Sequence, residues 1–185
     1  MKLYRVISGG QTGADQAGLF AATKFKVRTG GTAPDNWNTS RGSNPLLAAF
    51  GLQAYGNLNE RTEINIRDSD GTVIFTEQFD SPGSVITRSF CLKHKKPFLD
   101  IDLSCHVAKE LSGELTAVGG GLSGCEVAQK IAAFLREHNI GILNVAGNRE
   151  RHKNNLTFRH SALLLSETFL LLALEKELVQ DTERF

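Results

Sequence analysis

Short apolar runs alternate with helical patterns along most of this chain. Residues 4–7 form a short, mainly apolar run that suits a buried strand, and from residue 14 onward apolar positions recur with helical spacing. The strand, a glycine turn and the helix follow one another directly, as in the first βα unit of an α/β sheet. The opening of the chain therefore predicts an α/β fold.

The alternation continues to the C-terminus. Further strands are expected at 26–32, 72–75, 97–101 and 142–146, and helices at 61–68, 85–94, 126–138 and 157–179. Residues 33–59 are long, polar and irregular, with room for a helical turn at 46–52, and a loop of this length is typical of a lid or binding loop. The length of 185 residues predicts a single domain over residues 1–185.

Three glycines follow the first strand, at Gly9, Gly10 and Gly13. Such a turn directs backbone N–H groups and the positive end of a helix at whatever lies above the strand, so it favours phosphate binding. Thr12 and Asp15 also fit the helix-start pattern Thr-x-x-Asp, in which both side chains cap the helix. These two residues are therefore either ligands of an anion or caps.

Two further glycine segments precede predicted helices. Pro82-Gly83-Ser84 lies between a strand and a helix, so it predicts a second phosphate-facing turn. The run 119–124 matches GxGxxG, but Ser123 and Glu126 fit a capping box, and no acidic residue ends a next strand as dinucleotide binding requires. The run therefore does not favour NAD.

Composition narrows the choice of partners. The formal net charge is +1 with no basic stripe, which argues against a nucleic acid partner. The three cysteines form no CxxC and the five histidines have no zinc spacing, so no metal site is expected in a reduced, cytoplasmic protein. No signal peptide is evident, and the apolar stretch 161–174 is too short and too interrupted to span a membrane. It predicts a buried C-terminal helix that can also support a homo-oligomer.

Four segments together carry a family resemblance. They are SGGQTGADQAGL (8–19), RTEINIRDSDGTVIF (61–75), KHKKPFLDIDL (93–103) and ILNVAGNRER (142–151). In this order they resemble the molybdenum cofactor carrier family. This family is a circularly permuted branch of the Rossmann-like superfamily that includes the Lonely Guy phosphoribohydrolases and the lysine-decarboxylase-like proteins.

The resemblance implies a Rossmann-like, three-layer α/β/α fold with a mostly parallel sheet of five strands or slightly more. With the permutation, the strand order becomes 2-1-5-3-4, in which strand 5 is 142–146 and lies centrally. The turns after strands 1, 3 and 5 then meet at the carboxyl edge, where open α/β sheets bind ligands. The expected ligand is molybdenum cofactor (molybdopterin) or a nucleotide, with its phosphate bound by Gly9, Gly10, Gln11, Thr12, Gly13, Asp15, Gly83, Ser84, Gly147, Asn148 and Arg149.

Two functions follow from the resemblance. The first is a carrier or binding protein for a small phosphorylated pterin or nucleotide. The second is a nucleotide N-glycosidic hydrolase of the phosphoribohydrolase type, which needs a carboxylate near the ribose or the attacking water. Asp68, Asp70 and Glu150 are the candidates, although Asp70 also fits a turn before a glycine. The hydrolases carry a glutamate shortly after the second turn, where this chain has Arg88 and Ser89, so the carrier is favoured.

Overall fold

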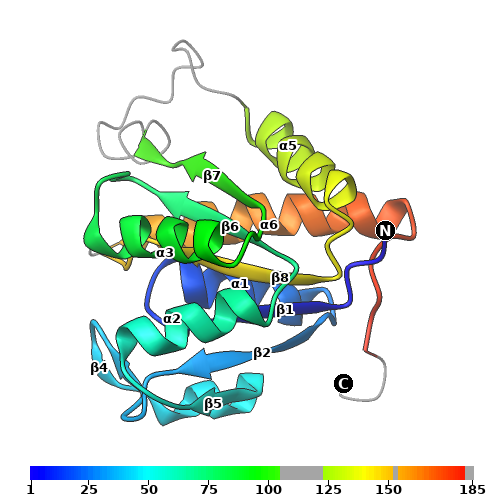
Figure 1. Cartoon of the computed structure of the whole chain (residues 1–185). Coiled ribbons are helices and arrows are strands. Elements are labelled where there is room, and N and C mark those ends of the chain that lie inside the picture. The colour runs from blue at the N-terminus through cyan, green and yellow to red at the C-terminus, as the bar shows by residue number, and fades with distance from the viewer. Residues whose placement is uncertain (105–122, 152–153, 182–185) are drawn as a thin grey trace.

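A six-stranded sheet forms the middle layer of the protein (Figure 1). The computed structural model describes residues 1–104, 123–151 and 154–181. The strand order is β5-β2-β1-β8-β6-β7, and every neighbouring pair is parallel. The strands are β1 (Arg5–Ser8), β2 (Arg28–Ala33), β5 (Leu52–Ala54), β6 (Gly71–Thr76), β7 (Phe98–Asp102) and β8 (Ile142–Gly147).

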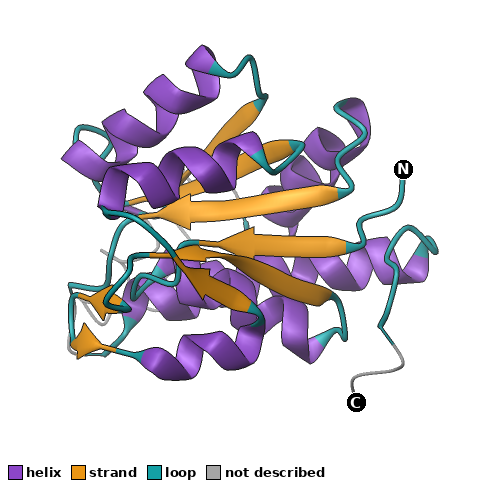
Figure 2. Cartoon of the chain, turned by 60° about the horizontal axis from the view of Figure 1, so that its bottom comes forward, coloured by secondary structure: helices purple, strands orange, loops and turns teal. Residues whose placement is uncertain are grey.

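Helices cover both faces of this sheet (Figure 2). On one face α6 packs between α1 and α5, and on the other face α2 packs beside α3. Their bounds are α1 (Ala14–Lys24), α2 (Leu58–Arg67), α3 (Pro82–Lys93), α5 (Gly124–Glu137) and α6 (Leu156–Leu174). The three-layer α/β/α architecture is therefore confirmed.

The central position predicted for the last strand is also confirmed. β8 pairs with β1 on one side and with β6 on the other. Leu143 and Val145 of β8 are fully buried, and a Cβ atom at Gly18 of α1 would lie 2.6 Å from the Val145 side chain. This close approach of helix and strand fixes the turn after β8 beside the turn after β1.

The segment 33–59 is more regular than the sequence indicates. It contains a small hairpin, β3 (Asn38–Thr39) and β4 (Gly42–Ser43), then a 3₁₀ helix (Pro45–Phe50), and then the edge strand β5. Leu47 and Leu52 form a second core cluster with Leu19 and Ala33, against which Trp37 packs. The expectation of an irregular loop was wrong, because pairing with β2 orders β5 and its short pattern gave no strand signal.

Several element ends differ from the predicted ones. α3 begins at Pro82, three residues early, because Ser81 caps it through the Ser84 amide. α6 ends at Leu174, five residues early, and Leu178 in the tail then pairs with Leu3. The predicted capping box of Ser123 and Glu126 is confirmed at the start of α5. The positions 119 and 121 of the glycine run lie outside the described residues.

α6 is the most apolar helix of the described residues. By length and composition it could cross a membrane, but half of that window is buried inside the protein, as in the core helix of a soluble fold. Leu163, Leu170 and Leu174 are exposed on its outer side. Self-association through this helix stays a prediction.

Candidate functional site

The turn after β1 contains three glycines because the protein's own atoms approach its backbone. A Cβ atom at Gly9 would lie 1.5 Å from Nη1 of Arg61, and one at Gly13 would lie 2.5 Å from the Asn148 carbonyl oxygen. Gly10 and Gly13 also have φ values of 72° and 87°, which favour glycine. The backbone contact at Gly13 excludes a side chain without any ligand, whereas a side chain at Gly9 would have to displace the Arg61 guanidinium.

The amides of this turn have partners within the protein. Gly10 N donates to Ser8 Oγ at 3.3 Å, Gln11 N to Asp15 Oδ2 at 3.2 Å, and Thr12 N to Gln11 Oε1 at 3.0 Å. The Asp15 carboxylate therefore lies where the sequence predicts an external anion. The capping alternative for Thr12 and Asp15 was wrong, since α1 has Gly13 as its N-cap and no side-chain cap hydrogen bond.

Asp15 forms a largely buried ion pair with Arg61. Arg61 Nη1 lies 3.1 Å from Asp15 Oδ2, and their side chains are 14% and 4% exposed. Burial raises the pKa of Asp15, while Arg61 and the amides of Gln11 and Gly9 oppose this rise. Arg61 Nε is buried without a partner among the described residues. Sequence reasoning missed Arg61 as a site residue, although it opens one of the four family segments.

A cavity of about 320 Å³ lies where three turns meet at the carboxyl edge of the sheet. We call it the arginine cavity, because Arg61, Arg149 and Arg151 line it and, among the described residues, no acidic one does. Leu58, Pro82 and Ile86 add apolar surface. The remaining lining residues are Gln11, Asn59, Thr62, Ser81, Gly83, Gly147 and Asn148.

The side chain of Asn148 joins two of these turns. Its Oδ1 accepts from Glu77 N at 2.7 Å and from Gln78 N at 3.0 Å, while its Nδ2 donates to Ser81 Oγ at 2.9 Å. Ser84 is 2% exposed, and its hydroxyl accepts from Ser81 at 2.8 Å. Asn148 therefore lines the cavity, and its side-chain carboxamide connects the turn after β8 to the turn after β6. Ser84 belongs to the helix cap and not to the cavity lining.

The N-terminus of α3 opens onto the arginine cavity. Pro82 has no N–H, Ser84 N donates to Ser81 Oγ, and Val85 N donates to Ser81 O. This leaves the Gly83 amide without a partner among the described residues. A Cβ atom at Gly83 would meet nothing within 4 Å. This amide and the helix dipole can therefore act on an anion in the cavity.

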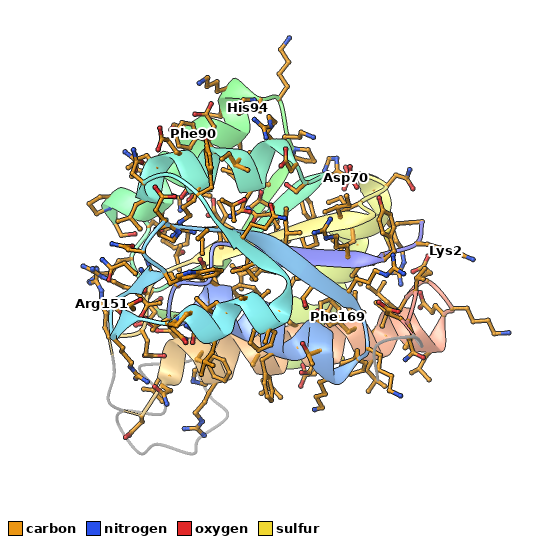
Figure 3. All side chains as sticks on the ribbon, turned by 90° about the horizontal axis from the view of Figure 1, so that it is seen from below. Lys2, Asp70, Phe90, His94, Arg151 and Phe169 are labelled. Carbon is orange, nitrogen blue, oxygen red and sulfur yellow. The ribbon has the colours of Figure 1, made fainter. Side chains whose placement is uncertain are left out.

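The three carboxylates proposed for hydrolysis lie elsewhere. Asp70 accepts from Gly141 N at 3.0 Å and from Ile142 N at 2.7 Å, at the amino edge of the sheet. Figure 3 shows Asp70 and Arg151 at opposite ends of the molecule. Asp68, which ends α2, pairs with its exposed neighbour Arg67.

Glu150 is close to the carboxyl edge but does not line the arginine cavity. It accepts from Phe158 N at 2.9 Å, in the first turn of α6. Arg88, at the position of the expected glutamate, binds both carboxylate oxygens of Asp100 in β7. Among the described residues, no group of three His, Cys, Asp or Glu side chains could hold a metal ion.

Comparison with known proteins now identifies the family. The model of the circularly permuted YpsA SLOG family matches residues 6–168. The chain belongs to this family. The predicted resemblance is thus confirmed, and with it the permutation that makes β8 central.

One solved structure extends the comparison. It is the crystal structure of the "Putative molybdenum carrier protein" from Syntrophus aciditrophicus, with 32% sequence identity and a TM-score of 0.74. The similarity covers 90% of this chain and 94% of the other. No curated protein matches the chain.

Proposed function

We propose that this member of the circularly permuted YpsA SLOG family is a carrier or binding protein for a small phosphorylated ligand. The observation that carries the proposal is the arginine cavity, in which three arginines and the start of α3 meet and no carboxylate of the described part of the chain lines the wall. Charge-assisted hydrogen bonds from arginine are the strong contacts to phosphate in proteins. A cavity with this lining suits a phosphate group.

The class of ligand comes from the similar structure and from the rest of the lining. The structure from Syntrophus aciditrophicus is named as a molybdenum carrier protein, which supports a phosphorylated pterin such as molybdenum cofactor. Leu58, Pro82 and Ile86 offer apolar surface beside the arginines, where a flat ring can pack. A nucleotide has the same two parts and is the other member of the proposed ligand class.

Hydrolysis is the less supported function. A general base must lie within hydrogen-bond reach of the attacking water. Asp15 lines the small adjoining pocket of about 60 Å³, but it is paired with Arg61. Asp68 and Asp70 line neither cavity, whereas Glu150 lines a third cavity, of about 430 Å³, beside Thr12 and Gly13 of the turn after β1.

Mass spectrometry tests the carrier directly. The protein is purified gently, denatured, and the released small molecules are identified. A retained phosphorylated pterin or nucleotide supports the proposal. Release of free base from added AMP, catalysed at a steady rate and lost in Glu150→Gln, would replace the carrier with a hydrolase.

A further inference from the structure

Arg61 lies between two neighbouring cavities. It lines the arginine cavity and also the small pocket of about 60 Å³ that adjoins it. Asp15 lines only the small pocket, and its Oδ2 lies 3.1 Å from Nη1 of Arg61. An anion that binds Arg61 from the arginine cavity therefore shares the guanidinium with a carboxylate of the protein.

The Arg61 guanidinium has donors to spare but only one positive charge. A guanidinium has five N–H donors. Nη1 of Arg61 donates to Asp15, whereas Nε is buried and has no partner among the described residues. A buried donor without an acceptor costs free energy, so a further acceptor is favourable. Arg61 can therefore bind a second anion, but it neutralises the charge of only one.

The other charged groups near Asp15 come from one turn. Arg149 and Arg151, in the turn after β8, line the arginine cavity but not the small pocket, and Glu150 of the same turn lines the third cavity. The residues that α3 and the strands add to the small pocket are uncharged. Of the described residues that line the arginine cavity or the small pocket, none is a histidine, and Asp15 is the one carboxylate. The Asp15 carboxyl is thus the group that can titrate beside a bound anion.

A second anion on Arg61 favours the protonated form of Asp15. Burial already raises the pKa of this carboxyl, and the charge of Arg61 is the largest effect that opposes the rise. A bound anion adds a negative charge beside the carboxylate, so the pKa of Asp15 rises further in the complex. A pKa that rises on binding means that a proton is taken up. By linkage, binding is then stronger at lower pH.

The turn after β1 can keep its form when Asp15 is neutral. The Gln11 amide donates to Asp15 Oδ2 at 3.2 Å, and a protonated carboxyl still has an oxygen that accepts this hydrogen bond. The new O–H group needs an acceptor, and the small pocket of about 60 Å³ has room for a water molecule that accepts from it. Protonation therefore removes the charge of Asp15 without removing its hydrogen bond to the turn.

We propose that Asp15 couples anion binding in the arginine cavity to the uptake of a proton. Its carboxylate is paired with Arg61 before an anion binds, and it becomes a neutral carboxyl when a phosphate or sulfate group binds Arg61. The proton comes from the solvent and forms the O–H bond, and no other covalent bond changes. The inference rests on the proposed function, because it needs an anion in this cavity, and it adds the residue that regulates the affinity.

Sulfate tests the coupling, because its own charge stays the same between pH 5 and pH 8. Its affinity is measured by calorimetry at constant ionic strength. We expect it to rise about tenfold from pH 7 to pH 5, within the limit of tenfold per pH unit that one coupled proton sets. Titrations at pH 6 in two buffers of different ionisation enthalpy count the protons taken up. This count uses the unmodified protein, so it does not depend on the folding of a variant.

Asp15→Asn assigns the proton to its residue. The variant keeps the shape of the side chain but not its charge, so it should bind sulfate about tenfold more tightly at pH 7 and take up no proton. Every other group still titrates in this variant, so the pH dependence that remains, less than about twofold, measures their share. Asp68→Asn makes the same change at an exposed carboxylate at the end of α2 and should keep the native pH dependence.

The outcomes separate this inference from the proposed function. Equal sulfate affinity at pH 5 and pH 7 without proton uptake would overturn the coupling and leave the proposed function standing. A native pH dependence in Asp15→Asn would do the same. Sulfate affinity unchanged in Arg149→Ala would place the anion outside the arginine cavity and also overturn the coupling. Absence of binding of both sulfate and pyrophosphate at every pH would overturn the coupling and the proposed function together.

Discussion

Two glycine-containing segments at the same edge of the sheet differ in what surrounds them. Gly9, Gly10 and Gly13 after β1 are closely packed by atoms of the protein, including Arg61 and the backbone of Asn148. Gly83, at the start of α3, has no atom within 4 Å of the place of a Cβ. The first turn is filled from within, and the second faces the arginine cavity.

The difference shows what a glycine-rich turn indicates. Three glycines after a strand indicate that other atoms come close to the backbone. These atoms can belong to a carboxylate and an arginine of the protein itself as well as to a ligand. The Asp15 carboxylate accepts the Gln11 amide and pairs with Arg61. The less glycine-rich segment is the open one, so the density of glycines does not locate the site.

The largest expected effect is that of Asp15→Ala. The variant leaves Arg61 without its buried partner and the Gln11 amide without its acceptor, so we expect a loss of about 3 kcal/mol in the free energy of unfolding. Urea unfolding measures this loss. Asp68→Ala, which removes an exposed carboxylate, is the control and should change stability little.

Asp15→Ala should also open the turn after β1 to an external anion, because it removes the carboxylate that occupies this turn. In an Arg149→Ala background, sulfate should raise the melting temperature more when Asp15 is alanine than when it is aspartate, because Arg61 is then available to the anion. Equal shifts would mean that Asp15 does not compete with an anion at this turn.

The second-largest effect is expected when one methyl group is added to each of the two segments in turn. Gly13→Ala places a Cβ atom 2.5 Å from a carbonyl oxygen at φ 87°, so we expect a loss of about 2–3 kcal/mol in the free energy of unfolding. Gly83→Ala, in open space within a helix, should leave stability unchanged or slightly higher. Similar losses in both variants would contradict the comparison.

A smaller change is expected for phosphate binding in the open cavity. Arg149→Ala should weaken the binding of AMP or pyrophosphate about tenfold, which is about 1.4 kcal/mol, because a charged hydrogen bond to phosphate is lost. Arg151→Ala should weaken it less, since the Arg151 guanidinium is already bonded to Gln78. Arg67→Ala, at the opposite edge, is the control for isothermal titration calorimetry. Affinity that is equal in Arg149→Ala and Arg67→Ala would remove phosphate from this cavity.

The smallest change is expected at Cys91, because the start of α3 faces the arginine cavity whereas Cys91, in its last turn, is buried. Cys91 is fully buried, and burial raises its thiol pKa to about 11. The thiol therefore stays protonated as the pH rises from 7 to 9, and maleimide should not label it until the protein unfolds. Peptide mapping checks this, with the exposed Cys125 as the labelled control. Labelling of both cysteines in the native protein would show that α3 opens.

Much of the fold could be predicted from the sequence. The apolar runs predicted five of the six strands of the main sheet and the five described α-helices, because a buried strand or an amphipathic helix leaves a local pattern. The central place of β8 followed from the family segments. The edge strand β5 was missed, because its order comes from pairing with β2 and from the contacts of Leu47 and Leu52.

The site was predictable only in part. The sequence by itself determined that turns after β1, β6 and β8 meet at one edge, and that Gly83, Gly147 and Arg149 lie there, because parallel strands bring their carboxyl ends together.

Only the tertiary structure decided which turn is open. Arg61 reaches Asp15 across 46 residues and fills the turn after β1, whereas Asp70 turns to the amino edge to bind the start of β8. Contacts between distant segments decide such matters, and a local pattern of residues does not contain them.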